Sequence, residues 1–324
     1  MRMRIFLKLS VLGFLSIFLL IALGSISGIT RERKGRLAAV QEDIAASYAG
    51  PQRILGPFAV LKFRETWTEK KYNSEKDLWY EDEQSALRTE AVCPDTLQYE
   101  GSLDVEERYR GIFKAHVFQS RGKLDGALTF PKLDELRSHD GSSLELISAH
   151  ISVIVSDPRG ISRVSGLKWG DVVLDILPGA DFQGKVDGFH AEVPALTDIL
   201  GQTVSFSMDL DLHGTETLRF VPVGANNRVT LTSSWPHPSF IGDFLATDRT
   251  VSDTGFNSEW NVNMLASSAR QDLKAGRVGS IQSFGVTLID PVNPYPLTDR
   301  ALKYGFLFIF ITFAAFLVLR KFLW

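Results

Sequence analysis

Ser165 and Lys168 have the spacing that places a lysine beside a nucleophilic serine when both lie on one helix. The residues around them favour a turn rather than a helix, and no companion motif follows. The sequence also has no Gly-x-Ser-x-Gly elbow, no glycine-rich phosphate loop and no His-Glu-x-x-His pattern. We therefore interpret the pair as a chance match and expect a protein that is not an enzyme.

Asp209, Asp211 and His213 alternate with apolar residues, so a strand there would project all three from one face. Two carboxylates and an imidazole are able to bind a divalent cation, with oxygen ligands suited to calcium. Alternate residues of a strand are ~6.6 Å apart, so other parts of the chain would have to complete the site. A solvated polar face is the simpler interpretation, and we expect neither a metal nor a cofactor.

An unusual string runs from Ser234 to Phe244 and contains the candidate recognition residues Trp235, His237, Phe240 and Asp243. Prolines on both sides of the histidine fix the backbone and remove two hydrogen-bond donors. Two interpretations remain open. The string forms a preformed recognition surface with the histidine at its tip, or a structural crossover whose aromatic rings fill the core. We prefer the crossover, because rigid aromatic loops more often pack than bind.

The elements that would position these residues begin with two apolar segments at the chain ends. Leu9 to Ile29 has 21 residues without a charge, enough to span a ~30 Å hydrocarbon core. Ala301 to Leu319 is a second such run, interrupted by Lys303. We predict a transmembrane helix in residues 1–30 and another in 298–324. The first could be a cleaved signal peptide, but its length and the lack of an Ala-x-Ala site favour retention.

Residues 31–50 continue the helical pattern as an amphipathic stalk, which Gly50-Pro51 ends. Past Pro57, apolar and polar residues alternate with a period of two in several segments, as from Val204 to His213 and from Phe256 to Asn263. This pattern predicts a mainly β, antiparallel sandwich-like domain in residues 51–297. The domain would be one body or two lobes with a seam at 177–201, and only Met264 to Leu273 reads as helix inside it.

Charge bears on partners and on orientation. The net charge is −3, which gives no electrostatic footprint for nucleic acid. The lone Cys93 permits no intrachain disulfide. The basic residues near the two apolar runs are Arg2, Arg4 and Lys8 before the first, Arg31, Arg33, Lys34 and Arg36 after it, and Arg320 and Lys321 after the second. Because long loops translocate largely regardless of charge, Arg320 and Lys321 after the second run decide the orientation. We therefore expect the β domain outside the cytoplasm.

Four strings resemble the CreD family of inner-membrane, cell envelope integrity proteins. They are 156–161 (SDPRGI), 231–245 (LTSSWPHPSFIGDFL), 255–260 (GFNSEW) and 296–304 (PLTDRALKY). The resemblance spans nearly the whole chain and implies a periplasmic domain linked to envelope stress, colicin tolerance and β-lactam response. It supplies no catalytic residues. Family members continue into further transmembrane helices where this chain ends at Trp324, so three interpretations stay open: a truncated gene product, a fragment, or a short member of the family. Family members also usually have proline where Ala246 stands here.

The first functional hypothesis is therefore a non-enzymatic protein of the cell inner membrane that supports envelope integrity. Its partners would be the lipid bilayer, envelope components or other membrane proteins, and not nucleic acid. A membrane-tethered periplasmic hydrolase would instead use Ser165 with Lys168, or a metal at Asp209, Asp211 and His213. A ligand-sensing ectodomain would need an apolar pocket with a few convergent polar groups.

Overall fold

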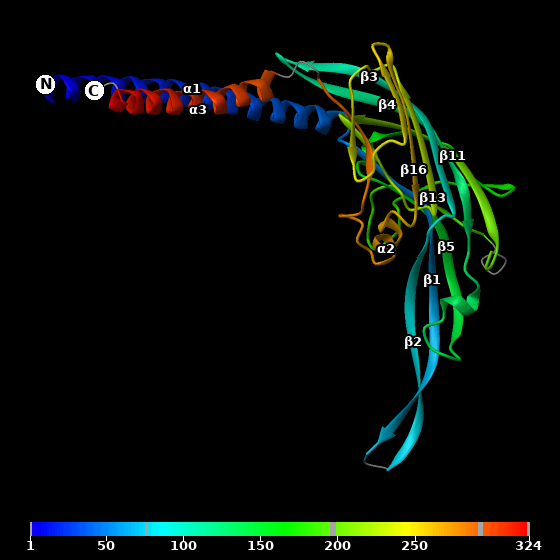
Figure 1. Ribbon diagram of the computed structural model, residues 1–324. Coiled ribbons are helices and arrows are strands. Elements are labelled where there is room, and N and C mark those ends of the chain that lie inside the picture. Colours follow the sequence, from blue (N-terminus) through cyan, green and yellow to red (C-terminus); the bar gives the residue numbers. More distant parts are fainter. Residues whose placement is uncertain (1, 75–76, 195–198, 291–293, 323–324) are drawn as a thin grey trace. The chain divides into compact units, whose positions relative to one another are not determined.

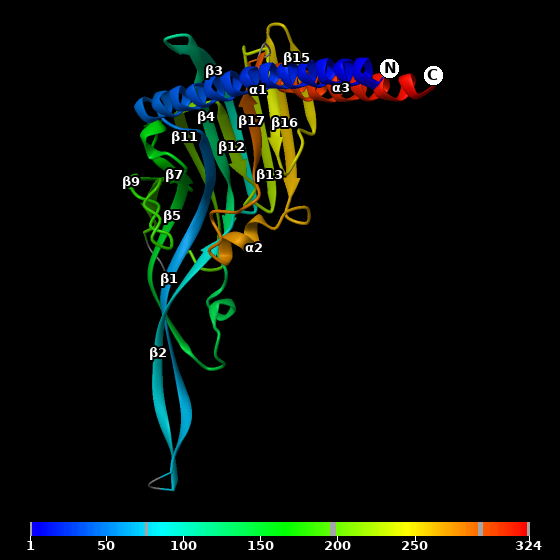
Figure 2. The same cartoon turned by 90° about the vertical axis from the view of Figure 1, so that its left-hand side faces the viewer.

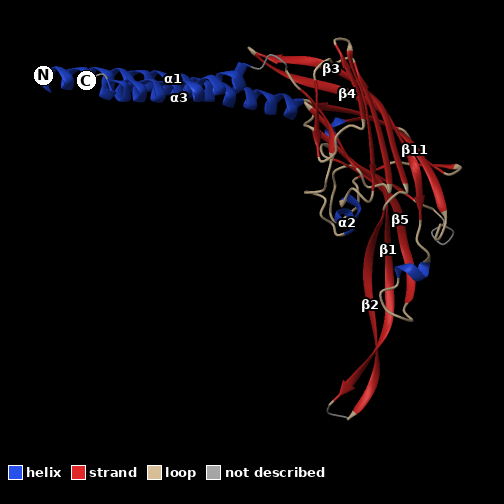
Figure 3. Cartoon of the chain, in the orientation of Figure 1, coloured by secondary structure: helices blue, strands red, loops and turns tan. Residues whose placement is uncertain are grey.

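The computed structural model describes residues 2–74, 77–194, 199–290 and 294–322. The chain divides into two compact units, one of residues 1–43, 109–114 and 290–324 and one of residues 44–108 and 115–289. Most helical residues lie near the chain ends, and the middle of the chain is mainly strands joined by loops (Figure 3). The helices are α1 (Arg2–Ser47), α2 (Ala269–Lys274) and α3 (Pro294–Phe322), with 3-10 turns η1 (Leu133–Leu136) and η2 (Pro158–Gly160).

The β strands form two sheets. The eight-stranded sheet has the order β14 (Pro238–Gly242), β17 (Phe284–Leu288), β12 (Thr217–Val221), β1 (Gln52–Asn73), β5 (Ser143–Val155), β10 (Phe189–Glu192) and β9 (Leu177–Pro178), with β2 (Leu78–Val92) also paired to β1. The nine-stranded sheet has the order β15 (Asp248–Ser252), β16 (Gly255–Asn263), β13 (Asn226–Ser233), β3 (Thr96–Arg110), β4 (Phe113–Thr129), β11 (Thr203–Thr215), β7 (Leu167–Trp169) and β8 (Val172–Leu174), with β6 (Ile161–Val164) also paired to β11.

The inner faces of the two sheets enclose one hydrophobic core. The ring centroids of Trp260 on β16 and Phe284 on β17 are 5.5 Å apart, and those of Tyr99 on β3 and Phe220 on β12 are 4.6 Å apart. Each pair joins one sheet to the other, so the prediction of a mainly β, sandwich-like domain is confirmed.

The predicted alternation also holds strand by strand. On β11 the apolar side chains from Phe206 to Leu212 are buried, and the polar ones between them are exposed or half-buried. The prediction that the sheets are antiparallel is wrong at two places, because β1 pairs with β12, and β3 with β13, in parallel. In both pairs more than a hundred residues separate the two strands along the sequence, a connection long enough to bring the second strand back in the same direction.

Some predicted boundaries differ from the observed ones. The helix expected from Met264 to Leu273 is shorter, since Ser267 and Ser268 bind the Gln282 side chain ahead of α2. The predicted seam at 177–201 supplies β9 and β10 to the eight-stranded sheet, and its residues 195–198 lie outside the described residues. One continuous helix, α1, runs from Arg2 to Ser47 and so includes most of the residues predicted as membrane span and stalk, and it ends three residues before the predicted end of the stalk.

A long hairpin of β1 and β2 extends beyond the other strands of its sheet (Figure 2). The two strands pair from Ala59 with Val92 to Asn73 with Leu78, whereas β5 accompanies β1 only as far as Thr66. The outer part of the hairpin is therefore a two-stranded ribbon.

The helices α1 and α3 lie side by side and antiparallel (Figure 1). Lys34 forms an ion pair with Asp299, and a Cβ on Gly305 would lie 3.4 Å from the Leu23 side chain. Buried and half-buried side chains recur at spacings of three and four on both helices, at Leu23, Ser27, Thr30, Lys34 and Leu37 on α1 and at Thr298, Leu302, Gly305, Ile309 and Thr312 on α3. This period is typical of paired helices, so each helix covers one face of the other.

Candidate recognition site at the crossover between the two sheets

The string singled out in the sequence is the segment that crosses from one sheet to the other. Strand β13 pairs with β16 in the nine-stranded sheet, and β14 pairs with β17 at the edge of the eight-stranded sheet. Residues 234–237 connect them. The prolines suit this position, because a rigid backbone holds the direction of the crossing and no ladder hydrogen bond is lost.

The aromatic residues of the crossover pack against the core. The ring of Trp235 lies 4.6 Å from that of His116, and its Nε1 donates to the His237 carbonyl at 3.1 Å. Phe240 contacts Trp260 edge to face at 5.7 Å, and Phe244 contacts Phe284 at 6.1 Å. These rings are half-buried, so they close the space between the sheets.

The two polar candidates of the crossover also have structural contacts. The carbonyl of His237 accepts from the Ile289 amide at 3.3 Å. The Oδ2 atom of Asp243 accepts from the Ser283 amide at 2.9 Å, and its own amide donates to the Ser283 carbonyl. These bonds tie the residues on either side of β14 to the residues on either side of β17. The contacts support the structural interpretation of the string, and recognition by Trp235, His237, Phe240 and Asp243 stays a prediction.

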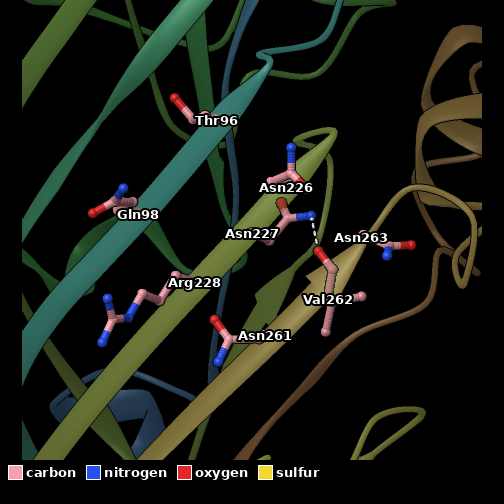
Figure 4. A pocket seen from close by; sticks show the side chains of 8 residues that line it. All are labelled: Thr96, Gln98, Asn226, Asn227, Arg228, Asn261, Val262 and Asn263. Carbon is pink, nitrogen blue, oxygen red and sulfur yellow. Dashed lines mark hydrogen bonds between the residues drawn. The ribbon is translucent and has the colours of Figure 1, made fainter.

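A polar recess of about 260 Å³ lies on the nine-stranded sheet (Figure 4). It is lined by Thr96, Gln98, Asn226, Asn227, Arg228, Asn261, Val262 and Asn263, from β3, β13 and β16. The buried Asn227 accepts from the Gly224 amide and donates to the carbonyls of Gly224 and Val262. The lining therefore offers amide and guanidinium hydrogen bonds but contains no activated nucleophile. Sequence reasoning missed the recess, although the run of asparagines opposite apolar residues was visible.

The predicted metal candidates lie on the outer face of β11, where basic residues offset their charge. The Arg163 guanidinium is 3.7 Å from the Asp209 carboxylate and 3.2 Å from that of Asp211. Across the ladder these residues pair with Lys123 and Arg121. The described part of the chain holds no group of three or more His, Cys, Asp or Glu side chains that could bind a metal. The metal hypothesis therefore finds no support there.

His213 does not share a site with Asp209 and Asp211, because it makes contacts of its own. Its ring stacks on that of Tyr48 at 5.2 Å, and its carbonyl accepts from Gln52 at 3.0 Å. These contacts join β11 to the segment that follows α1.

Ser165 and Lys168 are placed by strands rather than by a helix. The serine lies between β6 and β7, where its hydroxyl accepts from the Asp209 amide at 2.8 Å and donates to the Gly166 carbonyl. The lysine lies on β7 with its side chain exposed, and β7 pairs with β11. A serine held by backbone groups in this way is a strand-joining residue, so the geometry does not support a serine hydrolase.

A set of contacts that the sequence did not reveal lies at the end of α1. We call the contacts of Asp157 and Arg159 with the end of this helix the Asp157–Arg159 joint. The Asp157 Oδ2 atom accepts from the Gly50 amide at 2.8 Å and from Arg159 Nη2 at 2.6 Å. Arg159 Nη1 donates to the Ala46 carbonyl at 2.7 Å, so a cation satisfies a carbonyl in the last turn of the helix. The Arg159 guanidinium lowers the pKa of Asp157 from 3.8 to about 2. The only sequence signal was the Ser156–Ile161 string itself, whose partners lie more than a hundred residues away.

Two of the solved structures that this chain resembles have low TM-scores. A mutant M1 zinc metallopeptidase from Deinococcus radiodurans bound to a Tyr-Ser-Ala substrate has a TM-score of 0.29 and 11% identity, covering 52% of this chain and 39% of its own. A second M1 zinc metallopeptidase structure from the same organism has a TM-score of 0.24 and 12% identity, covering 53% of this chain and 39% of its own.

Comparison of sequences is more informative. The inner membrane protein CreD of Escherichia coli K12 is 33% identical over 317 residues, which are 97% of this chain and 68% of that protein. The family described as inner membrane protein CreD matches residues 4–322. The chain belongs to the CreD family of inner membrane proteins.

Proposed function

We propose that α1 and α3 anchor this protein in the cytoplasmic membrane, with the β domain on the periplasmic side, where it supports cell envelope integrity. The role includes the response to envelope stress and tolerance of β-lactams and colicins. Its partners are the lipid bilayer and, through the β domain, envelope components or other membrane proteins.

The observation that carries the proposal is the apolar surface of the paired helices. On α1 the exposed fractions of Phe14, Phe18 and Ile21 are 74%, 60% and 63%, and on α3 those of Phe308 and Phe310 are 72% and 73%. So many large apolar side chains facing outward on two adjacent helices suit lipid and not water. Within the described residues, Gly13–Ser47 is the one helix that meets the length and hydropathy expected of a membrane span.

A non-enzymatic role is supported by how the candidate residues are used. Ser165 is bound by backbone groups, Asp209 and Asp211 face cations, and the crossover residues join two sheets. We therefore assign the β domain to binding or mechanical support of the envelope rather than to catalysis.

The test combines topology with function in bacteria that lack their own family member. A reporter that is active only in the periplasm is fused after Asp290, and a matched fusion is made after Lys8. We expect activity from the first fusion alone, together with restored resistance to detergent or β-lactam. A periplasmic signal without rescue would contradict the envelope function, and a cytoplasmic signal after Asp290 would contradict the topology.

A further inference from the structure

The paired helices α1 and α3 carry a ring of basic side chains. It lies where the apolar run of α1 ends and where that of α3 begins. On α1 the uncharged run ends at Thr30, and on α3 the apolar run begins after Lys303. The ion pair of Lys34 with Asp299 and the approach of Gly305 to Leu23 place these two ends at the same level. We call Arg31, Arg33, Lys34, Arg36, Arg300 and Lys303 the basic collar.

The collar has a large excess of positive charge. It contains six cations, against the two carboxylates Glu32 and Asp299 in the same helical turns. Arg36 pairs with Glu32 at 2.7 Å, and Lys34 pairs with Asp299. Within the described residues, no carboxylate is seen to pair with the four remaining cations, which are exposed. A ligand for this ring must therefore be anionic.

The proposed orientation makes the excess positive charge of the basic collar unusual unless a ligand offsets it. In the proposed orientation the collar lies on the periplasmic side, although basic residues generally favour the cytoplasmic side. The four basic residues that follow the first apolar run outnumber the three that precede it. Basic side chains at the end of a hydrocarbon-spanning segment meet the phosphate layer of the bilayer, where anionic headgroups are the available counter-ions.

We propose that the basic collar is a binding site for phosphate-bearing anionic lipid headgroups in the outer leaflet of the membrane. The site rests on the proposed function, because the collar reaches headgroups only when α1 and α3 are in the bilayer. Arg31 and Arg33 come immediately after the apolar run of α1, while Arg300 and Lys303 precede that of α3. Headgroups would thus be bound around both helices, which fixes their depth in the bilayer.

The test measures lipid association by electron spin resonance of the full chain in phosphatidylcholine vesicles. Trace spin-labelled phosphatidylglycerol or phosphatidylcholine reports the fraction of lipid immobilised by the protein. We expect the anionic lipid to be preferred on the order of fivefold. The preference should fall as salt rises from about 0.1 M to about 1 M, since the Debye length shortens from about 10 Å to about 3 Å.

The variant R31Q/R33Q/R36Q/R300Q/K303Q should lose the preference. The matched control R121Q/K123Q/R163Q/R228Q/R249Q removes five exposed cations of the β domain and should keep it. Loss in both variants, or an unchanged preference in the collar variant, would overturn the assignment. Inorganic phosphate should compete no better than chloride at equal ionic strength, and specific competition would show a site for free phosphate instead. Failure of the chain to enter vesicles at all would count against the proposed membrane anchoring, not against the collar alone.

Discussion

The Arg159 guanidinium donates to the main-chain carbonyl of Ala46 at 2.7 Å, which places a β-domain side chain on the last turn of α1. Asp157 holds the same guanidinium and also accepts from the Gly50 amide. The Asp157–Arg159 pair therefore fixes the chain between the end of α1 and the start of β1.

The pH dependence of stability should report this joint. The pKa of Asp157 is lowered from 3.8 to about 2, so its stabilisation is fully present above pH 3.8 and is lost as the pH falls through about 2. Solvent screening limits the effect to about 1 kcal/mol at most. Acid unfolding followed by circular dichroism should show this loss in the wild type and not in D157N. The exposed control D248N should behave as the wild type, and an identical acid response in D157N would contradict the assignment.

Much of the β domain was predictable because its signal is local. The alternation on β11 and β16 follows from one buried and one solvated face. The string around Trp235 connects β13 of one sheet to β14 of the other. The Asp157–Arg159 joint and the parallel pairs were not predictable, since each depends on residues far apart in sequence. A single sequence shows which residues alternate but not which distant strand or helix end they meet.

Glycine at position 122 should be required by the ring of Tyr99. The ring is buried and the Tyr99 hydroxyl bonds to the Ser120 hydroxyl at 2.6 Å. A Cβ at Gly122 would clash with the hydroxyl oxygen and the ring of Tyr99. We expect G122A to lower the free energy of unfolding by about 2–3 kcal/mol, as for an overpacked core. The control G279A, with open space around its Cβ, should change it by less than about 0.5 kcal/mol. Equal stabilities in denaturant titrations would show that Tyr99 relaxes freely.

The buried Glu65 carboxylate should hold the connection between β4 and β5. Its Oε1 accepts from the amides of Ser138 and His139 and from the Ser142 hydroxyl, and its Oε2 accepts from Arg88. These donors keep its pKa well below its ordinary range. We expect E65Q to lower the unfolding temperature by about 5 °C or more and to speed proteolysis of residues 137–142.

A control at an exposed carboxylate distinguishes the effect of burial on stability from the effect of losing a charge. Glu145 pairs with Arg64 at 2.9 Å with its side chain 67% exposed. The variant E145Q should shift the unfolding temperature by about 1 °C or less. A shift in E65Q as small as this would show that the loop is held by other contacts.

The crossover residues should separate into structural and recognition roles. W235A should lower the free energy of unfolding by about 2–3 kcal/mol, because its ring packs on His116 and its Nε1 bond is lost. The control L245A, whose side chain is 75% exposed, should change it by less than about 0.5 kcal/mol.

H237A tests recognition in the same segment. It keeps the main-chain bond to Ile289, so it should fold with nearly wild-type stability. If it fails to restore envelope resistance while remaining folded in the membrane, the histidine acts in recognition. Full rescue by H237A would leave the segment a purely structural crossover.

Thiol labelling of spheroplasts will show whether the β domain lies outside the cytoplasm, as we propose. Cys93 is buried and burial raises the pKa of its thiol, both of which slow its labelling, and the variant C93A removes any labelling at this position. In that background a single cysteine is placed at the exposed Asp253, between β15 and β16, or at Arg4, ahead of the first apolar run. A membrane-impermeant maleimide applied to spheroplasts should label D253C before lysis and R4C only after lysis. Labelling of D253C only after lysis would place the β domain in the cytoplasm and overturn the proposed topology.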